Sequence, residues 1–292
     1  MLFTRFAPSP TGYLHRGHLL SALFVFAAAD LFSAKVRLRI EDHDKSRARK
    51  EYIDSIPEDL ERFGFKFESV SLQSKRQALY EKYAEILFSK QKLYPCSCSR
   101  KKLFEENPVN ADGEVIYSGH CLKNPIDKNS DFALRFKTPD KTITWEDLLL
   151  GKFEENPKNQ CGDFTIKDRI SQWTYQFAVC VDDLEENIGL VVRGEDLRNS
   201  TARQIALLEA LGKKTPPLYL HHPLLTEKSG EKLSKRQHSK SLRAELEQGL
   251  SIEDLLGLVC YEAHSIPKKA PLTLNEAIYS IQKTYFSCFL KK

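Results

Sequence analysis

The sequence has no stretch of apolar residues long enough to cross a bilayer. Its most hydrophobic run, LLSALFVFAAA at 19–29, ends at Asp30, well short of the about 20 residues that a membrane helix needs. The first residues, MLFTRFAPSP, also lack the sustained apolar core of a secretory signal, because prolines interrupt them at once. These absences predict a cytoplasmic protein that has no membrane partner.

A disulfide framework is not expected either. The seven cysteines are an odd number scattered over 292 residues, whereas disulfide frameworks are typical of short secreted chains. We interpret Cys161, Cys180, Cys260 and Cys288 as buried thiols. The net charge of +4 is small, so charge alone permits a polyanionic partner without requiring one.

The sequence has no internal repeat and no G-x-x-x-x-G-K-[ST] phosphate loop, but strand and helix patterns alternate along it. Residues 2–8 predict a short strand, residues 17–32 a buried helix, and residues 35–42 a strand with alternating apolar side chains. Strand, helix and strand within about 40 residues form a βαβ unit, which predicts a parallel sheet with a ligand crevice at the carboxyl ends of its strands. Further parallel-sheet signals are QFAVCVDD at 176–183 and GLVVRGED at 189–196.

A segment rich in Asn, Asp, Pro and Gly, with three clustered cysteines, interrupts these patterns. We therefore predict an α/β chain in four parts, in which an insertion separates two halves of a Rossmann-like domain. The parts are residues 1–93 and 171–240 for the two halves, 94–170 for the insertion and 241–292 for a short helical region.

Two basic motifs carry the first chemical signal. In HRGH, His15 and His18 flank Gly17 at the start of the expected helix, where unpaired N–H groups and the helix dipole favour an anion. Gly17 would let a flat base approach the backbone. In KLSKR, Lys232 and Lys235 follow Gly230, and a lysine loop can neutralise charge on a triphosphate. Each motif is weak alone, since histidine pairs are often structural and KLSKR is often a solvated loop, but their order with α/β signals between them is informative.

Four segments together resemble the catalytic domain of bacterial glutamyl-tRNA synthetases of class I. They are RFAPSPTGYLHRGH, RLRIEDHD, VVRGEDLRNSTARQIALLEALG and HHPLLTEKSGEKLSKR, and the resemblance covers most of residues 3–240. HRGH stands at the family's H-I-G-H position and KLSKR at its K-M-S-K-S position. The resemblance implies a class I synthetase fold, with ATP bound by His15, Gly17, His18 and Lys235, and catalysis of amino-acid adenylation by His15, His18, Lys232 and Lys235.

A pocket for glutamate needs cations, a hydroxyl and one anion, because glutamate carries two carboxylates and an ammonium. Arg5 and Arg193 can each hold a carboxylate, Tyr175 can donate a further hydrogen bond, and Glu41 can hold the ammonium. By resemblance, the turn residues Phe6, Ala7, Pro8 and Ser9 complete the pocket. For any one of these side chains the alternative is a surface ion pair, and the sequence does not assign the arginines to particular carboxylates.

The three clustered cysteines, Cys96, Cys98 and Cys121, suit one structural Zn²⁺, which is usually four-coordinate. Free thiols are the alternative, because this spacing is only moderately specific. The family carries a zinc site in this inserted region, which favours the metal. The fourth ligand is open between Tyr117, placed Y-x-x-x-C before Cys121 as in the truncated glutamyl-Q tRNA(Asp) synthetases, and His120, a commoner ligand type. The family pattern favours Tyr117.

Residues 241–292 are too few for the long anticodon-reading region of a full glutamyl-tRNA synthetase, which favours resemblance to the glutamyl-Q tRNA(Asp) synthetases. That resemblance implies tRNA-independent activation of L-glutamate by ATP with Mg²⁺, and transfer to the queuosine at the wobble position of tRNA(Asp). It also leads us to expect a monomer. Two alternatives stay open: a minimal glutamyl-tRNA synthetase that charges the tRNA 3′ end, and a non-catalytic tRNA-binding module.

Overall fold

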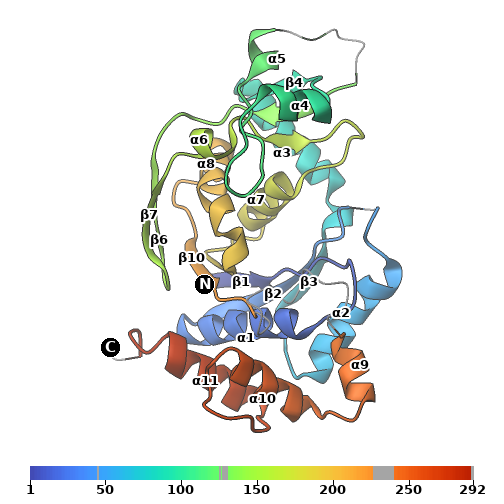
Figure 1. The fold of residues 1–292 in the computed structure, drawn as a ribbon, viewed down its shortest axis with the longest axis vertical. Helices are drawn as coiled ribbons and strands as arrows, with labels where there is room; N and C mark the ends of the chain where they lie inside the picture. Colours follow the sequence, from blue (N-terminus) through green and yellow to red (C-terminus); the bar gives the residue numbers. More distant parts are fainter. Residues whose placement is uncertain (45, 125, 127–130, 226–239, 291–292) are drawn as a thin grey trace.

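The structure, a computed structural model, describes residues 1–44, 46–124, 126, 131–225 and 240–290. Its centre is a layer of parallel strands built from both halves of the chain (Figure 1). In the first half, β1 (Leu2–Phe6) pairs in parallel with β2 (Ala34–Ile40), and β2 with β3 (Ser69–Leu72). In the second half, β9 (Leu190–Gly194) pairs in parallel with β10 (Leu218–His222).

The two halves meet where β1 lies beside β9. Phe3 and Ile188 form a parallel bridge, and the Gly189 N–H donates to the Phe3 carbonyl at 3.0 Å. On the far side of β10, β6 (Ile143–Asp147) joins in parallel, and β7 (Gly151–Glu155) closes the edge antiparallel to β6. The predicted parallel α/β sheet is thereby confirmed.

Helix α1 (Arg16–Leu31) lies between this sheet and the carboxy-terminal helices α10 (Ile252–Glu262) and α11 (Leu274–Tyr285), as Figure 1 shows. Because both sides of α1 are covered, its sequence is apolar on nearly every face. Gln282 of α11 donates to the Ala27 carbonyl at 3.1 Å and to Asp30 Oδ2 at 2.7 Å. The helical region predicted after residue 240 is thus part of the same core.

Arg16, at the first position of α1, ties that helix end to the carboxy-terminal region. Its guanidinium donates to Glu245 in α9 (Leu242–Glu247) at 3.1 Å and to Glu262 in α10 at 2.5 Å. A cation at a helix amino terminus opposes the helix dipole. The two carboxylates offset that unfavourable interaction.

The expectation that QFAVCVDD forms a strand is wrong, because this stretch lies inside helix α7 (Tyr175–Glu185). Residues 177–183 are all buried, and a short run of buried apolar residues fits a buried helix as well as a buried strand. The contacts of the acidic residues at and just after the end of this stretch distinguish a helix from a strand. Asp182 and Glu186, four residues apart, both accept hydrogen bonds from Arg76, which is the spacing of one helix face.

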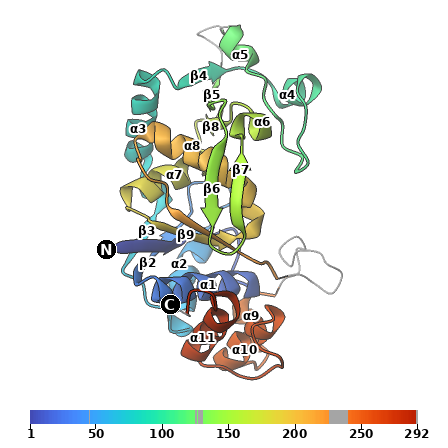
Figure 2. The same cartoon turned by 90° about the vertical axis from the view of Figure 1, so that its left-hand side faces the viewer.

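Residues 94–170 contribute to two sheets. The β6–β7 hairpin belongs to the large sheet, whereas β4 (Leu93–Cys96), β5 (Ala133–Phe136) and β8 (Thr165–Lys167) form a separate antiparallel sheet at one end of the molecule (Figure 2). The short helices α4 (Arg100–Glu106) and α5 (His120–Lys123) lie beside this smaller sheet.

The remaining elements cover the sheets. They are α2 (Lys50–Arg62), η1 (Gln73–Lys75), α3 (Gln77–Ser89), α6 (Pro157–Cys161), η2 (Glu195–Ser200) and α8 (Thr201–Leu211). Within the residues that the structure describes, no helix is both long and apolar enough to cross a membrane.

Candidate active site

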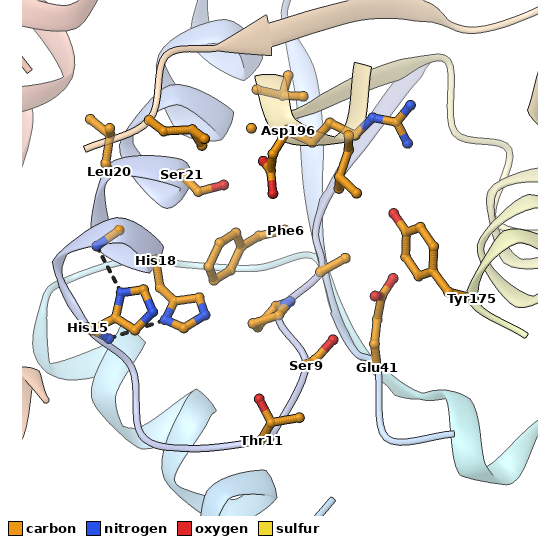
Figure 3. Close-up of a pocket in the computed structure, with 18 of the residues that line it drawn as sticks. Phe6, Ser9, Thr11, His15, His18, Leu20, Ser21, Glu41, Tyr175 and Asp196 are labelled. Atoms are coloured by element: carbon orange, nitrogen blue, oxygen red, sulfur yellow. Dashed lines mark hydrogen bonds between the residues drawn. The ribbon is translucent and has the colours of Figure 1, made fainter. Parts of the chain in front are cut away.

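A cavity of about 510 Å³ opens at the carboxyl ends of β1, β2 and β9 and at the amino terminus of α1 (Figure 3). Parallel strands end at one edge of a sheet, so the side chains that follow them converge there. The residues predicted for glutamate and ATP that line it are Arg5, Phe6, Ala7, Pro8, Ser9, His15, Gly17, His18, Glu41, Tyr175 and Arg193. The other two predicted residues, Lys232 and Lys235, lie outside the described part of the chain.

The two histidines form the cap of α1. His15 Nδ1 accepts the Gly17 N–H at 3.1 Å, and His18 Nδ1 accepts the His15 N–H at 3.2 Å. The rings are 3.9 Å apart between centroids. Because both Nδ1 atoms are used by the cap, a contact with phosphate would be made through Nε2.

Gly17 is required by the His15 ring. A Cβ at position 17 would lie 2.9 Å from His15 Cε1, so a side chain there would displace the imidazole. This contact is a further reason for a glycine here, and the predicted approach of a base to the backbone stays a prediction.

Arg5 is held by a buried ion network. Its Nε donates to Asp183 Oδ1 at 3.0 Å, and its Nη1 donates to the Val192 carbonyl at 3.2 Å. Asp183 also accepts from Arg39 at 2.7 Å. Burial raises the pKa of Asp183, but the two guanidinium groups outweigh burial and hold it below its ordinary value. Asp183 is therefore ionised and fixes the direction of Arg5.

Glu41 and Tyr175 lie on the side of the pocket opposite the two histidines (Figure 3). Burial raises the pKa of Glu41 to about 7, although Arg39 and Arg5 act in the opposite direction. Burial and then the Glu41 charge raise the pKa of Tyr175 to about 12, so its hydroxyl keeps its proton at neutral pH. The Glu41 N–H donates to the Pro8 carbonyl at 3.0 Å, which joins the end of β2 to the turn after β1.

Arg193, at the end of β9, is surrounded differently. Its guanidinium donates to three neutral acceptors: Gln204 Oε1 at 2.7 Å, Thr201 Oγ1 at 2.9 Å and His221 Nε2 at 3.0 Å. Sequence reasoning did not find these three supporting residues. The sequence did hold a signal for them, because they lie within two of the segments that carry the family resemblance, HHPLLTEKSGEKLSKR and VVRGEDLRNSTARQIALLEALG.

Other lining residues were also not predicted. The polar ones are Thr11, Ser21, His43, Asp44, Arg47, Asp196 and His222. Several of them directly follow predicted residues in the sequence. His43 and Asp44 come just after Glu41, and Asp196 comes just after the strand that carries Arg193, so the rule that strand ends converge would have found them.

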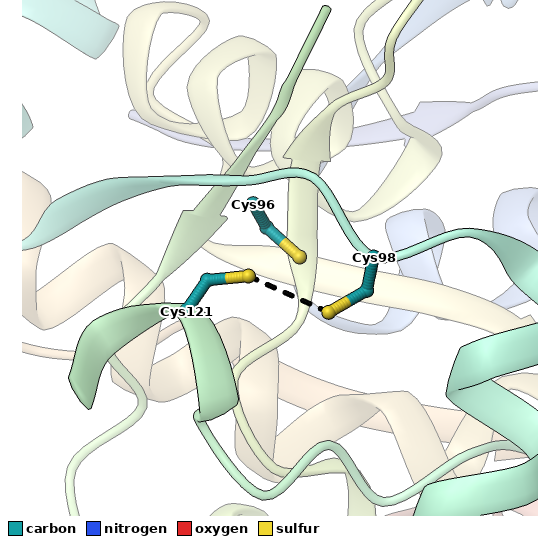
Figure 4. Close-up of side chains that lie close together, drawn as sticks. All are labelled: Cys96, Cys98 and Cys121. Carbon is teal, nitrogen blue, oxygen red and sulfur yellow. Dashed lines mark hydrogen bonds between the residues drawn. The ribbon is translucent and has the colours of Figure 1, made fainter. Parts of the chain in front are cut away.

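The three clustered cysteines converge in the smaller sheet region, and their Sγ atoms all lie within 4.8 Å of one another (Figure 4). Cys96 and Cys121 are buried and Cys98 is half-buried. Although burial raises the pKa of the Cys121 thiol, hydrogen bonds, led by that from Tyr117, lower it to about 7. Burial raises the pKa of the Cys98 thiol to about 11. Thiols deprotonate when they bind a metal, so the convergence of the three sulfurs is what allows the group to hold a metal ion.

Tyr117 lies at the centre of this cluster. Its hydroxyl is 3.5 Å from both Cys96 Sγ and Cys98 Sγ, and it accepts the Cys121 N–H at 2.9 Å. Its backbone is held against Gly162, where a Cβ would lie 2.1 Å from the Tyr117 carbonyl oxygen. His120, the alternative fourth ligand, instead has its Nε2 3.4 Å from Lys102 Nζ.

Comparison with known proteins gives a consistent result. Residues 1–265 match the family model of the catalytic domain of class I tRNA synthetases for glutamate and glutamine. The chain is 40% identical over 242 residues to the glutamyl-Q tRNA(Asp) synthetase of Neisseria meningitidis serogroup C, strain 053442, covering 82% of this chain and 81% of that protein. It is 34% identical over 296 residues to the glutamyl-Q tRNA(Asp) synthetase of Nitratidesulfovibrio vulgaris, covering 95% and 91%.

Glutamate–tRNA ligases are matched over a smaller share of their length. The chain is 37% identical over 276 residues to that of Aquifex aeolicus, which covers 91% of this chain but 58% of the ligase. Among solved structures, the glutamate-tRNA synthetase of Elizabethkingia anophelis superposes with a TM-score of 0.75 at 26% identity. That match covers 95% of this chain, which spans 65% of the length of the solved synthetase.

Proposed function

The chain belongs to the family of class I tRNA synthetases for glutamate and glutamine, and from this premise we propose that it activates L-glutamate with ATP, without requiring tRNA, and transfers it to the queuosine of tRNA(Asp). The observation that carries the proposal is a pocket that two arginines, a buried carboxyl and a tyrosine line together with the histidine-capped end of α1. The relatives named for this reaction are matched over 81% and 91% of their length, which favours them over the longer ligases.

In the proposed glutamate complex, Arg5 and Arg193 bind the two carboxylates by charge-assisted hydrogen bonds. Glu41 binds the ammonium, and the Tyr175 hydroxyl donates a further hydrogen bond. The turn of Phe6, Ala7, Pro8 and Ser9 closes the pocket. The pKa of about 7 for Glu41 supports this role, because a nearby ammonium would favour the ionised carboxylate.

In the first step, a glutamate carboxylate oxygen attacks the α-phosphorus of ATP. A bond forms between these atoms, the bond from the α-phosphorus to the bridging oxygen breaks, and pyrophosphate leaves with that electron pair. His15, His18 and the amino terminus of α1 stabilise the phosphate charge, and Gly17 keeps the His15 ring in place. From their sequence motif, Lys232 and Lys235 add positive charge, as does Mg²⁺ carried in with ATP.

In the second step, a hydroxyl of queuosine attacks the activated carbonyl, the bond between the acyl carbon and the phosphate oxygen breaks, and AMP leaves with that electron pair while its phosphate takes up the hydroxyl proton. We assign no general base to this step among the described residues that line the pocket. The acyl-adenylate is already activated, so positioning of the hydroxyl suffices. Single substitutions of candidate bases should then leave transfer from preformed adenylate within about an order of magnitude, and a collapse at one position would overturn this.

We further propose that one structural Zn²⁺ is held by Cys96, Cys98, Cys121 and Tyr117. Tetrahedral Zn–S bonds of about 2.3 Å place the sulfurs roughly 3.8 Å apart. The 3.4 Å between Cys98 Sγ and Cys121 Sγ, with the Tyr117 hydroxyl beside the group, supports the fit. Zinc supplies a cross-link in the smaller sheet region. A cytoplasmic monomer is the form in which we expect the enzyme to act.

The proposal is tested with labelled glutamate, ATP and three tRNA preparations. These are tRNA(Asp) with queuosine, tRNA(Asp) with unmodified guanosine, and tRNA(Glu). Label on the queuosine-containing tRNA alone supports the proposal. Label on the 3′ end of tRNA(Glu) would instead support a minimal glutamyl-tRNA synthetase, the alternative that the 37% identity to a glutamate–tRNA ligase favours. If no glutamate-dependent ATP–pyrophosphate exchange is detected, the result supports the alternative of a non-catalytic tRNA-binding module.

A further inference from the structure

Three buried side chains on neighbouring strands form a chain that ends at the pocket. Asp147 at the end of β6 contacts His221 on β10, and His221 contacts Arg193 on β9. Their exposed fractions are 1%, 0% and 5%. Arg193 lines the pocket, whereas Asp147 and His221 lie behind it. The two inner residues therefore influence a ligand only through Arg193.

The contacts of His221 fix its protonation. Asp147 Oδ2 lies 2.6 Å from His221 Nδ1 and also accepts the His221 backbone N–H at 3.0 Å, so a carboxylate oxygen faces Nδ1 and the proton is on that nitrogen. On the other side of the ring, Nε2 receives the Nε–H of Arg193 at 3.0 Å. A guanidinium offers only donors, so Nε2 must be unprotonated and accept with its lone pair. Both contacts require the same neutral tautomer.

The charges around His221 agree with a neutral ring. Burial, together with the charges of Arg193 and Arg198, lowers its pKa, while Asp147 acts to raise it. Tyr219, two residues earlier on β10, stacks on the ring with its centroid 6.2 Å away, and burial raises its pKa well above its ordinary value, so it adds no charge at neutral pH.

Arg193 thus uses three of the five N–H groups of a guanidinium on neutral acceptors, and two remain to be donated. Among the described residues, no carboxylate forms an ion pair with Arg193, in contrast to Arg5, which is paired with Asp183. The arrangement orients the cation without neutralising it. Gln204, one of the three acceptors, is itself held by a hydrogen bond to Gln176 Oε1 at 2.8 Å, so the acceptors are fixed in turn.

We propose that Asp147 and His221 are positioning residues that hold Arg193 for one carboxylate of the amino-acid substrate. Asp147 sets the tautomer of His221, and the neutral His221 ring sets the direction of the guanidinium while leaving its charge to the ligand. This inference rests on the proposed function, since it takes the ligand of Arg193 to be glutamate.

The conservative substitution Asp147→Asn tests the tautomer directly. Asp147 Oδ1 accepts the Leu149 and Leu150 N–H groups at 2.9 and 3.0 Å, and Oδ2 accepts from His221. An asparagine must turn its NH₂ toward one of these two sets of donors. An NH₂ facing Nδ1 moves the ring proton to Nε2, which then points an N–H at the Arg193 Nε–H. This orientation is the less costly one, because the ring can give up its Nδ1 proton and leave one backbone N–H facing the NH₂ instead of two, and in it an isosteric change breaks the Arg193 contact.

The kinetic experiment measures ATP–pyrophosphate exchange over a range of glutamate and ATP concentrations. D147N and H221L should raise the KM for glutamate about ten-fold and leave the KM for ATP within about two-fold. H221Q, which restores an acceptor for Arg193, should recover most of the loss. Tyr219→Phe is the matched control, because it changes the neighbouring buried side chain on β10 and keeps all three contacts; its kinetics should match wild type.

Equal loss of stability in D147N and H221L without a selective rise in the glutamate KM would overturn the proposal in favour of a structural cluster. If wild type shows no exchange, the proposed function fails first, and a second measurement still tests the inference. Nitrogen-15 NMR of wild type should show His221 protonated at Nδ1 and not at Nε2, and D147N should reverse this. A protonated Nε2 in wild type would overturn the positioning role whatever the enzyme activates.

Discussion

The substitution Glu41→Gln should make the unliganded protein more stable at pH 8 while weakening its glutamate binding. Glu41 is buried, and its pKa is raised from the ordinary value of 4.5 to about 7. A raised carboxyl pKa means that the folded state disfavours the ionised form, so the wild type loses stability as the pH rises from about 4.5 to 7. Glutamine has nearly the same shape and does not ionise.

The magnitude follows from the two pKa values. A shift of one unit corresponds to about 1.4 kcal/mol, so ionised Glu41 costs the folded state about 3 kcal/mol at pH 8. Part of that cost is already present at pH 5, where the unfolded state is partly ionised. Between pH 5 and pH 8, the free energy of unfolding of the variant should therefore rise relative to wild type by about 2–3 kcal/mol.

The effect on binding has the opposite sign. The ionised Glu41 is the proposed partner of the substrate ammonium, and a hydrogen bond between charged groups contributes about 1.5–3 kcal/mol. Its loss should raise the KM for glutamate by about 10- to 150-fold. One residue, Glu41, should thus reduce stability and provide binding at the same pH.

Urea unfolding of both proteins at pH 5, 6, 7 and 8, with pyrophosphate exchange at pH 8, measures both effects. Glu68→Gln is the control, because Glu68 is half exposed and is paired with Lys35 at 2.7 Å; it should show neither change. A stability difference between wild type and Glu41→Gln that is the same at pH 5 and pH 8 would refute the buried-charge argument. An unchanged glutamate KM would refute the role assigned to Glu41.

Three further predictions concern the metal group and the helix cap. Cys121→Ser should bind zinc at least about 100-fold more weakly than wild type, as metal analysis after dialysis against a chelator would reveal. Tyr117→Phe should speed zinc loss to the same chelator whereas His120→Ala should not, because the tyrosine hydroxyl and not the imidazole lies against the sulfurs; the reverse order would assign the fourth ligand to His120. Gly17→Ala should displace the His15 ring, remove about 1 kcal/mol of helix-cap stability and lower kcat for exchange by about 10- to 100-fold; wild-type values in both assays would contradict the steric reading.

Much of the pocket could be predicted because its residues lie at predictable places in the chain. Arg5, Glu41 and Arg193 sit in or just after strands of a parallel sheet, and the ends of such strands share one edge. Strand periodicity and the quoted motifs therefore predict from the sequence that these residues share one pocket. The roles of these residues remain predictions.

The residues that support the pocket could not be found in this way. Asp183 orients Arg5 from 178 residues away in the sequence, and a pattern within a short stretch of sequence cannot predict a contact over such a separation. Asp183 makes this contact from helix α7, in the stretch QFAVCVDD that the sequence predicted as a strand. Likewise, whether Tyr117 or His120 faces the sulfurs depends on side-chain direction, which spacing does not specify.

Arg16, the second residue of HRGH, limits where this chain can be cut to build a chimera with a relative. Arg16 joins the capped end of α1 to Glu245 and Glu262, so residues beyond 240 are attached to the first motif of the sequence. A chimera that exchanged the tail at residue 240 for one without acids at these positions would leave this guanidinium, at the start of α1, without its carboxylates. A transferable unit therefore has to carry Arg16 and its two acids together.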